Sequence, residues 1–101
     1  MRRRGRVDGN HAEVVSAFRR CGATVFSTAG VGSGYPDLTV GIYGMTHLVE
    51  IKDGDLAPSK RRLTTDEKEW HASWAGEPVE IVESATQAAY LVWTWRRTEL
   101  A

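Results

Sequence analysis

Two carboxylates and one amine, Asp37, Glu50 and Lys52, stand in the stretch "GYPDLTVGIYGMTHLVEIK", residues 34–52, where their types and spacing could do chemistry. Two β-rich runs, "DLTVGIY" and "MTHLVEIK", meet around Gly44, which predicts an antiparallel hairpin. If Tyr43 and Gly44 occupy the turn, residues that face each other have numbers that sum to 87, so Asp37 faces Glu50. The Cβ atoms of such neighbours lie about 4.5 to 5.5 Å apart, and like charges there destabilise a sheet.

Strand alternation adds Lys52 to this carboxylate pair. Side chains alternate along a strand, so Glu50 and Lys52 share one face while Val49 and Ile51 point to the other. The apolar neighbours of Glu50 in "HLVEIK" indicate a central, half-buried strand. A buried carboxylate pair needs a proton or a cation between its members, and Mg²⁺ accepts one or two carboxylates together with waters and phosphate oxygens. The alternative is two solvent-facing acids at sheet ends, partly compensated by Lys52.

The elements that must position these residues can be read along the chain. Residues 1–9 carry four arginines and two glycines without an apolar period, and we expect a flexible basic arm. Residues 10–101 are expected to form one domain. Its first helix starts after Asn10 as N-cap and stops near Gly22, and the strand "ATVFST" and the glycine loop "AGVGSGYP" follow.

The second half of the chain completes an α/β pattern. Thr64 with Glu67 three residues later predicts a capping box at the start of a helix that ends near Gly76. The strand "VEIV" and a last helix from Ser84 complete the order α-β-β-β-α-β-α. The prediction is a mixed β-sheet flanked by helices.

Composition limits the class of protein. Of 101 residues, 42% are apolar and 26% are charged, which is typical of a globular domain. The formal net charge is zero, but basic clusters at residues 1–6, 60–62 and 95–97 raise the expectation of a polyanionic partner. The single cysteine, Cys21, excludes an intramolecular disulfide and a thiolate metal site. No apolar run approaches 18 residues, so we expect no membrane partner and a cytoplasmic protein, cytosolic in whatever cell makes it.

Several motifs together resemble a known family. Pro36-Asp37 followed by Glu50-Ile51-Lys52 resembles the PD-(D/E)XK nuclease signature. The joint order of a helix-borne acid, "GYPDL", "EIK" and "LT" opening a helix resembles the VRR-NUC branch of that superfamily, from about Asn10 to Ser84. The resemblance implies a restriction-endonuclease-like fold and a phosphodiesterase that cuts DNA with one or two Mg²⁺ or Mn²⁺ ions.

The resemblance also implies roles for residues. Asp37 and Glu50 would hold the metal, with the carbonyl of Ile51 as a further ligand, and Glu13 on the first helix matches the helix-borne acid. Lys52 would orient or help deprotonate the attacking water. Such residues suit the reaction, because diester hydrolysis needs an activated water and a neutralised phosphate.

Two further residues are weaker candidates. Glu67 stands where the family commonly has glutamine, so it either adds negative charge to the site or only caps its helix. His71 lies four residues after Glu67 on the same helical face, and we expect it to hydrogen-bond Glu67 rather than approach the site.

The aromatic residues and His47 have structural interpretations. His47 is expected to be a packed or edge histidine, and Trp70 and Trp74, four residues apart, are expected in the core. The last helix, "SATQAAYLVWTWRR", is apolar on more than one side, which predicts burial nearly all round, partly by a second copy. A homodimer also suits small stand-alone members of the resembled family, which would cut two strands symmetrically.

The glycine loop and one basic cluster are expected to contact the DNA backbone; the residues are Ser33, Gly34, Tyr35, Lys60, Arg61 and Arg62. Phosphate contacts position DNA without reading its sequence. We therefore expect a structure-selective endonuclease for branched DNA such as four-way (Holliday) junctions. Three alternatives stay open: a non-catalytic DNA-binding or assembly module, a sequence-dependent restriction-type endonuclease, and an RNA nuclease.

Overall fold

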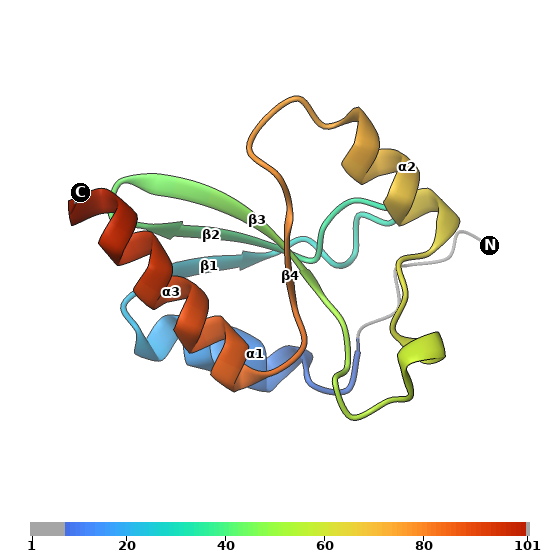
Figure 1. The fold of residues 1–101 in the computed structure, drawn as a ribbon, viewed down its shortest axis with the longest axis horizontal. Helices are drawn as coiled ribbons and strands as arrows, with labels where there is room; N and C mark the ends of the chain where they lie inside the picture. Colours follow the sequence, from blue (N-terminus) through green and yellow to red (C-terminus); the bar gives the residue numbers. More distant parts are fainter. Residues whose placement is uncertain (1–7, 101) are drawn as a thin grey trace.

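The computed structural model describes residues 8–100, and of the basic arm expected at residues 1–9 only Asp8 and Gly9 fall inside this range. Three α-helices, four strands and one short 3₁₀ helix follow one another in the described chain (Figure 1). Their bounds, in order, are α1 His11–Arg20, β1 Thr24–Ser27, β2 Leu38–Ile42, β3 Met45–Ile51, η1 Pro58–Lys60, α2 Thr65–Ser73, β4 Glu80–Val82 and α3 Ala85–Leu100.

The four strands form one mixed sheet in the order β1-β2-β3-β4. Neighbours are antiparallel from β1 to β3, and β4 runs parallel to β3. The parallel pair requires a crossover, and the segment containing η1 and α2 supplies it. The predicted α/β class with a mixed sheet and flanking helices is confirmed at this level.

The predicted hairpin register is also confirmed. Leu38 pairs with Val49 and Ile42 with Met45, so facing residues in β2 and β3 have numbers that sum to 87. Tyr43 and Gly44 form the connecting turn with φ angles of 53° and 74°. Positive φ at both central residues is what a two-residue hairpin turn needs to match the twist of its strands.

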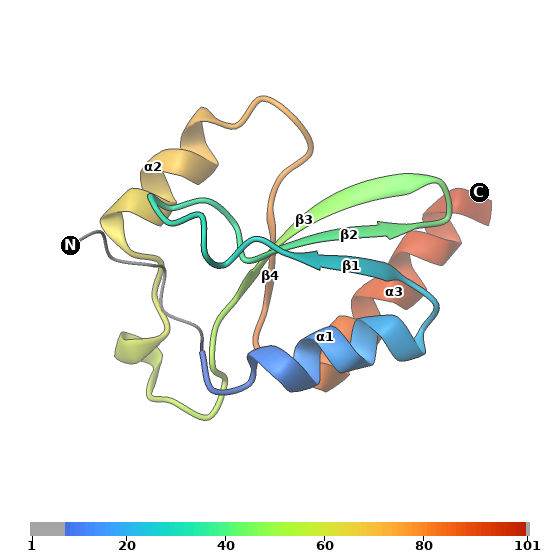
Figure 2. The same ribbon diagram turned by 180° about the vertical axis from the view of Figure 1, so that it is seen from behind.

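The core lies between one face of the sheet and the helices α1 and α3, which lie side by side on that face in both views (Figures 1 and 2). Phe18 from α1 and His47 from β3 each stack on Trp95 from α3, with ring centroids 5.9 and 3.8 Å apart. His47 is buried, so the expected packed histidine is confirmed. Burial lowers the pKa of His47, which leaves the ring neutral in this apolar stack.

Within this chain α3 is buried along one side only, and the expected burial nearly all round is not reached. Val92 and Trp95 pack into the core, whereas Tyr90 and Trp93 are exposed. The helix contacts α1 and β4 but has no element on its outer side among the described residues. Trp93 instead stacks on Tyr90 and lies under the guanidinium of Arg97, 5.0 Å from the ring centroid.

Trp70 and Trp74 do not belong to this core, and the interpretation that placed them there is wrong. Their helix, α2, lies away from α1 and α3, beside the loop between β1 and β2 (Figure 2). Trp70 stacks on Trp74 with centroids 5.0 Å apart and meets the edge of Tyr35 at the same distance. The i, i+4 spacing correctly predicts that both rings lie side by side. It does not predict on which side of the sheet the crossover places α2.

Asn10 precedes α1 as predicted, yet its side chain does not cap the helix. The buried amide nitrogen of Asn10 donates to the carbonyl oxygens of Lys52 and Glu83, each at 3.0 Å. These two carbonyls lie just beyond the ends of β3 and β4, so Asn10 ties the start of α1 to that end of the sheet.

No helix within residues 8–100 is long and apolar enough to span a membrane.

A glycine in the β1–β2 loop is required by the approach of α2. Gly34 has a φ of +83°, and a Cβ atom there would lie 2.3 Å from the carbonyl oxygen of Asp66. Gly22 has a similar φ of +98° but open space around it. The two positions therefore share the backbone conformation and differ in the steric contact.

We predict that Gly34→Ala lowers the free energy of unfolding by about 3 kcal/mol or more, because left-handed strain and a backbone clash add together. Gly22→Ala is the matched control and is expected to lose only about 1 to 2 kcal/mol. Urea unfolding followed by tryptophan fluorescence measures both. Equal losses would show that α2 does not press against the loop.

Candidate active site

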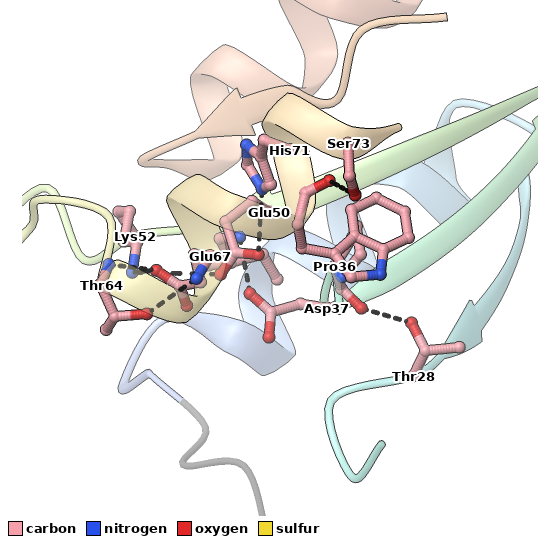
Figure 3. Close-up of polar contacts among 11 residues, drawn as sticks. Thr28, Pro36, Asp37, Glu50, Lys52, Thr64, Glu67, His71 and Ser73 are labelled. Atoms are coloured by element: carbon pink, nitrogen blue, oxygen red, sulfur yellow. Dashed lines mark hydrogen bonds and ion pairs between the residues drawn. The ribbon is translucent and has the colours of Figure 1, made fainter. Parts of the chain in front are cut away.

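The site lies where β1 and β3 end and β2 begins. Asp37 immediately precedes β2, and its Oδ2 accepts a hydrogen bond of 2.8 Å from the backbone N–H of Ile51 (Figure 3). Thr28 fixes the Pro36-Asp37 backbone, since its hydroxyl donates to the Pro36 carbonyl and its N–H to the Asp37 carbonyl, both at 2.7 Å. Asp37 is thus held opposite the end of β3, as the hairpin register predicts.

Glu50 is the most buried charged group of the described chain, at 2% exposure. Its Oε1 has no hydrogen-bond partner among residues 8–100. Burial raises the pKa of Glu50 well above neutrality, and the hydrogen bond and charge of Asp37, followed by Glu67, add to this effect. Without a cation, Glu50 therefore keeps its proton at neutral pH.

Lys52 is held beside these carboxylates. Its Nζ lies 2.7 Å from Oε1 of Glu67 and 3.9 Å from Oε2 of Glu50. Burial works to lower the pKa of Lys52, but the hydrogen bond and charge of Glu67 and the charge of Glu50 outweigh it and raise the pKa. Lys52 is accordingly a buried ammonium group.

Glu67 both caps its helix and belongs to the site, so its two interpretations hold together. Thr64 and Glu67 form the predicted capping box, with hydrogen bonds of 2.8 and 3.1 Å. The Oε1 that accepts the Thr64 N–H also accepts the Lys52 ammonium. Burial alone would raise the pKa of Glu67, but these bonds lower it, so the carboxylate stays charged.

His71 turns toward Glu50, and the hydrogen bond to Glu67 that its spacing suggested is wrong. Its Nε2 lies 3.9 Å from Oε1 of Glu50 and has no hydrogen-bond partner within residues 8–100. Burial lowers the pKa of His71, against the nearby charge of Glu67 and together with that of Lys52. A neutral imidazole therefore faces the carboxylate pair.

These contacts follow a regular match between α2 and β3. Successive turns of the helix place Glu67 at Lys52 and His71 at Glu50 (Figure 3). One helical turn rises about 5.4 Å and two strand residues about 6.6 Å, so alternate residues of β3 meet successive turns of α2. Along the chain, these two contacts run forward on α2 and backward on the segment that carries Glu50 and Lys52.

Glu13, by contrast, is not brought into contact with this group. It lies exposed on the first turn of α1, and no hydrogen bond or ion pair joins it to another described residue. It stands one turn from Asn10, whose amide contacts the Lys52 carbonyl. Ile51, by its backbone N–H, lies within the group.

Asp8 is a carboxyl group that the sequence interpretation missed. It is half-buried, and burial raises its pKa while the charge of Lys52 lowers it and those of Asp37, Asp53 and Glu67 raise it. Asp8 is therefore within electrostatic range of the site. Nothing in the sequence marks it, since it stands in the segment interpreted as an arm and belongs to no motif.

The residues expected to contact DNA phosphates lie in two groups. Ser33 is exposed, whereas Gly34 packs against the first turn of α2 and Tyr35 against Trp70. Lys60 and Arg62 are exposed, and Arg61 donates to Glu83 at 2.9 Å. The cations free of an ion pair in this cluster are thus Lys60 and Arg62, among the described residues.

The donor set suits a hard cation bound by few protein ligands. No three His, Cys, Asp or Glu side chains within residues 8–100 converge closely enough to hold an ion by themselves. Mg²⁺, however, usually takes one or two carboxylates and completes its shell with waters and substrate oxygens. Glu50 carries an unpartnered oxygen, Oε1, and lies beside Asp37, so its carboxyl is the kind of group such an ion would bind.

In comparisons with known proteins, no family model, no curated protein and no solved structure matches this chain. The functional conclusion rests on the geometry and chemistry of the site.

The proton that Glu50 keeps in the folded protein predicts a pH dependence of stability. In the unfolded chain Glu50 ionises near pH 4.5, whereas in the folded protein it keeps its proton to higher pH. Between these values the folded state binds the extra proton, so the free energy of unfolding falls as pH rises, by at most about 1.4 kcal/mol per pH unit. Glu50→Gln, a neutral mimic, lacks this loss.

We predict that in EDTA the stability advantage of Glu50→Gln over wild type grows from pH 5 to pH 8. Guanidinium unfolding at each pH measures it. Glu69→Gln, on an exposed position of α2, serves as control. Parallel pH profiles for wild type and Glu50→Gln would contradict the raised pKa of Glu50.

Proposed function

We propose that this protein is a metal-dependent, structure-selective DNA endonuclease on a restriction-endonuclease-like fold. The observation that carries the proposal is Glu50, a buried carboxyl with an unpartnered oxygen, held against Asp37 and within 3.9 Å of the Lys52 ammonium. A sheet gains no stability from such a group, because a buried carboxylate beside a second one is unfavourable without a cation or proton. The arrangement is the one expected of a site for a cation and a phosphate.

Asp37 and Glu50 would hold Mg²⁺ or Mn²⁺, with the Ile51 carbonyl as a further ligand. When bound, the ion would supply an activated water and neutralise the phosphate. Thr28 and the Ile51 N–H keep Asp37 in place before any ion arrives. Glu13, exposed on α1, is proposed only as a water-mediated or late contact.

The electrostatics of Lys52 decide between its two proposed roles. Its raised pKa keeps the amine protonated, which favours orienting the water and offsetting charge on the phosphorane over removing a proton. Glu67 holds the ammonium at 2.7 Å and thereby fixes its position. Neutral His71 beside Glu50 is the better candidate to accept a proton in this site.

Branched DNA is proposed as the substrate because the candidate phosphate contacts carry no sequence information. Ser33, Lys60 and Arg62 are exposed and would contact the backbone. No described helix projects from the domain as a reading element for the major groove; α1 and α3 pack on the sheet and α2 lies over the site. A four-way junction is the substrate to test first.

We expect wild-type protein to nick an end-labelled four-way junction with Mg²⁺ or Mn²⁺ and not in EDTA. Asp37→Asn and Lys52→Ala should each lower the single-turnover rate by about 100-fold or more, because each removes a group that acts on the reacting phosphate. Lys68→Ala, an exposed lysine of the same helix as Glu67, is the matched control and should cut normally.

The alternatives make different predictions in the same assay. Junction binding in EDTA without any cutting, unchanged by Asp37→Asn, would replace the nuclease with a binding module. Discrete fragments from linear duplex would indicate a sequence-dependent enzyme. Faster cutting of an RNA substrate of matched sequence would indicate an RNA nuclease.

A homodimer is proposed because two copies would present two sites to opposite strands of a junction. Light scattering is expected to give twice the chain mass of 11.2 kDa. A mass of one chain at concentrations that support paired nicking would contradict the dimer and leave the nuclease proposal in place.

A further inference from the structure

A cavity of about 310 Å³ lies on the open face of the sheet, beside the candidate active site but outside it. Its walls include Tyr35, Trp74 and Pro78, and the side chains of Thr39 and Leu48 form its floor. This size falls at the lower end of the range found for small-molecule sites, about 300 to 1,000 Å³. The mechanism proposed above leaves it without a role.

The cavity is placed one step along the strands from the carboxylate pair. Thr39 and Leu48 face each other across β2 and β3. Each is two residues from a site residue, Asp37 and Glu50 respectively, so all four side chains point to the same face. Two residues of a strand span about 6.6 Å. A nucleotide whose phosphate lies at the carboxylates would therefore have its base near the cavity.

The aromatic wall is held rigidly. The indole N–H of Trp74 donates to the Glu77 carbonyl at 3.0 Å, and its ring stacks on Trp70. A Cβ atom on Gly76 would meet the Trp74 ring at 2.7 Å, so this residue must be glycine for the ring to lie as it does. Trp74 nevertheless remains 42% exposed. A fixed and partly exposed indole offers a surface on which a nucleobase can stack.

The polar groups around the cavity suit a base and not a phosphate. No lysine or arginine is among the residues that line it, and Thr39 and Thr46 bring hydroxyl groups from the open face of the sheet. The ring of His47 belongs to the opposite face, where it stacks on Trp95, so it brings no charge to the cavity. The hydroxyls of Thr39 and Thr46 can donate hydrogen bonds to a base edge and accept them from it. The carboxylate of Glu77, 3.8 Å from Nδ1 of His47, repels phosphate.

We propose that this cavity binds an unpaired nucleobase next to the scissile phosphate. The inference rests on the proposed nuclease function and deepens it, because it specifies the substrate: the nucleotide at the cut must be free of its partner. A base inside a duplex is stacked and paired and cannot enter a pocket without leaving the helix. Ends of duplex arms at a branch point, flaps and bulges offer such a base at least cost.

Abasic substitution tests the proposal, since it removes one base and leaves the phosphates in place. A set of junctions carries a single abasic nucleotide at each position around the cut. One abasic position beside the cut is expected to slow cleavage by about 10-fold, in the range of a lost base–aromatic contact. Trp74→Ala should lose the same factor on intact junction and show no further loss at that position.

Two control variants separate loss of the aromatic contact from a general effect on folding. Trp74→Phe keeps an aromatic wall and is expected to retain most of the sensitivity. Leu56→Ala removes a side chain exposed to the same extent, 42%, outside the cavity, and should behave as wild type. The abasic scan on unmodified protein remains decisive even if a Trp74 variant does not fold.

Binding in EDTA distinguishes failure of this proposal from failure of the nuclease. Fluorescence anisotropy of a labelled single-stranded oligonucleotide, with and without abasic positions, needs no catalysis. Cleavage that is indifferent to every abasic position would overturn base binding and leave the nuclease intact. Absence of cleavage together with base-dependent binding, lost in Trp74→Ala, would overturn the nuclease and support the cavity as a nucleobase site.

Discussion

The burial of Glu50 opposite Asp37 is the constraint on which the rest of this site depends. A carboxyl at 2% exposure beside a second carboxyl is unfavourable as an anion, so Glu50 keeps its proton in the folded protein. Lys52 adds one positive charge, but its ammonium group pairs with the Glu67 carboxylate at 2.7 Å. The charge of Lys52 is therefore shared with Glu67 and does not neutralise both Asp37 and Glu50. No described group donates a hydrogen bond to Glu50 Oε1.

Helix α2 and the residue after it bring further side chains to the buried carboxylates and to the cavity beside them. Because one helical turn is close in length to two strand residues, α2 meets β3 at regular intervals. Glu67 lies at Lys52, His71 lies at Glu50, and Trp74 lines the cavity whose floor includes Leu48. Helix α2 and the residue that ends it thus hold Lys52 in its charged form, bring His71 to Glu50 and form part of the cavity wall. Its placement depends on a capping box at one end and on Gly34, where only a hydrogen atom fits against Asp66.

The success of individual predictions follows the range of the interaction involved. The hairpin register came from a two-residue turn and a strand period of two, both local, and the pairs of β2 and β3 agree with it. The capping box of Thr64 and Glu67 is equally local and is present. Asn10 holds the predicted N-cap position, but its side chain, like that of His71, turns from a nearby partner on its own helix to a residue far along the chain. Trp70 and Trp74 were assigned to the core because periodicity shows that two rings share a face without showing what that face covers.

The sequence by itself determined the α/β class, the hairpin that sets Asp37 against Glu50, and the face that Lys52 shares with them, because each follows from backbone periodicity over a few residues. Only the tertiary structure decided that His71 faces Glu50, that Glu67 serves both Thr64 and Lys52, and that Asp8 lies near the same charges. It also decided that Glu13 stays exposed and that an aromatic cavity opens beside the carboxylates. The physical reason is that these features depend on where the crossover lays α2 across the sheet. That placement follows from packing between segments distant in sequence, which no local pattern encodes.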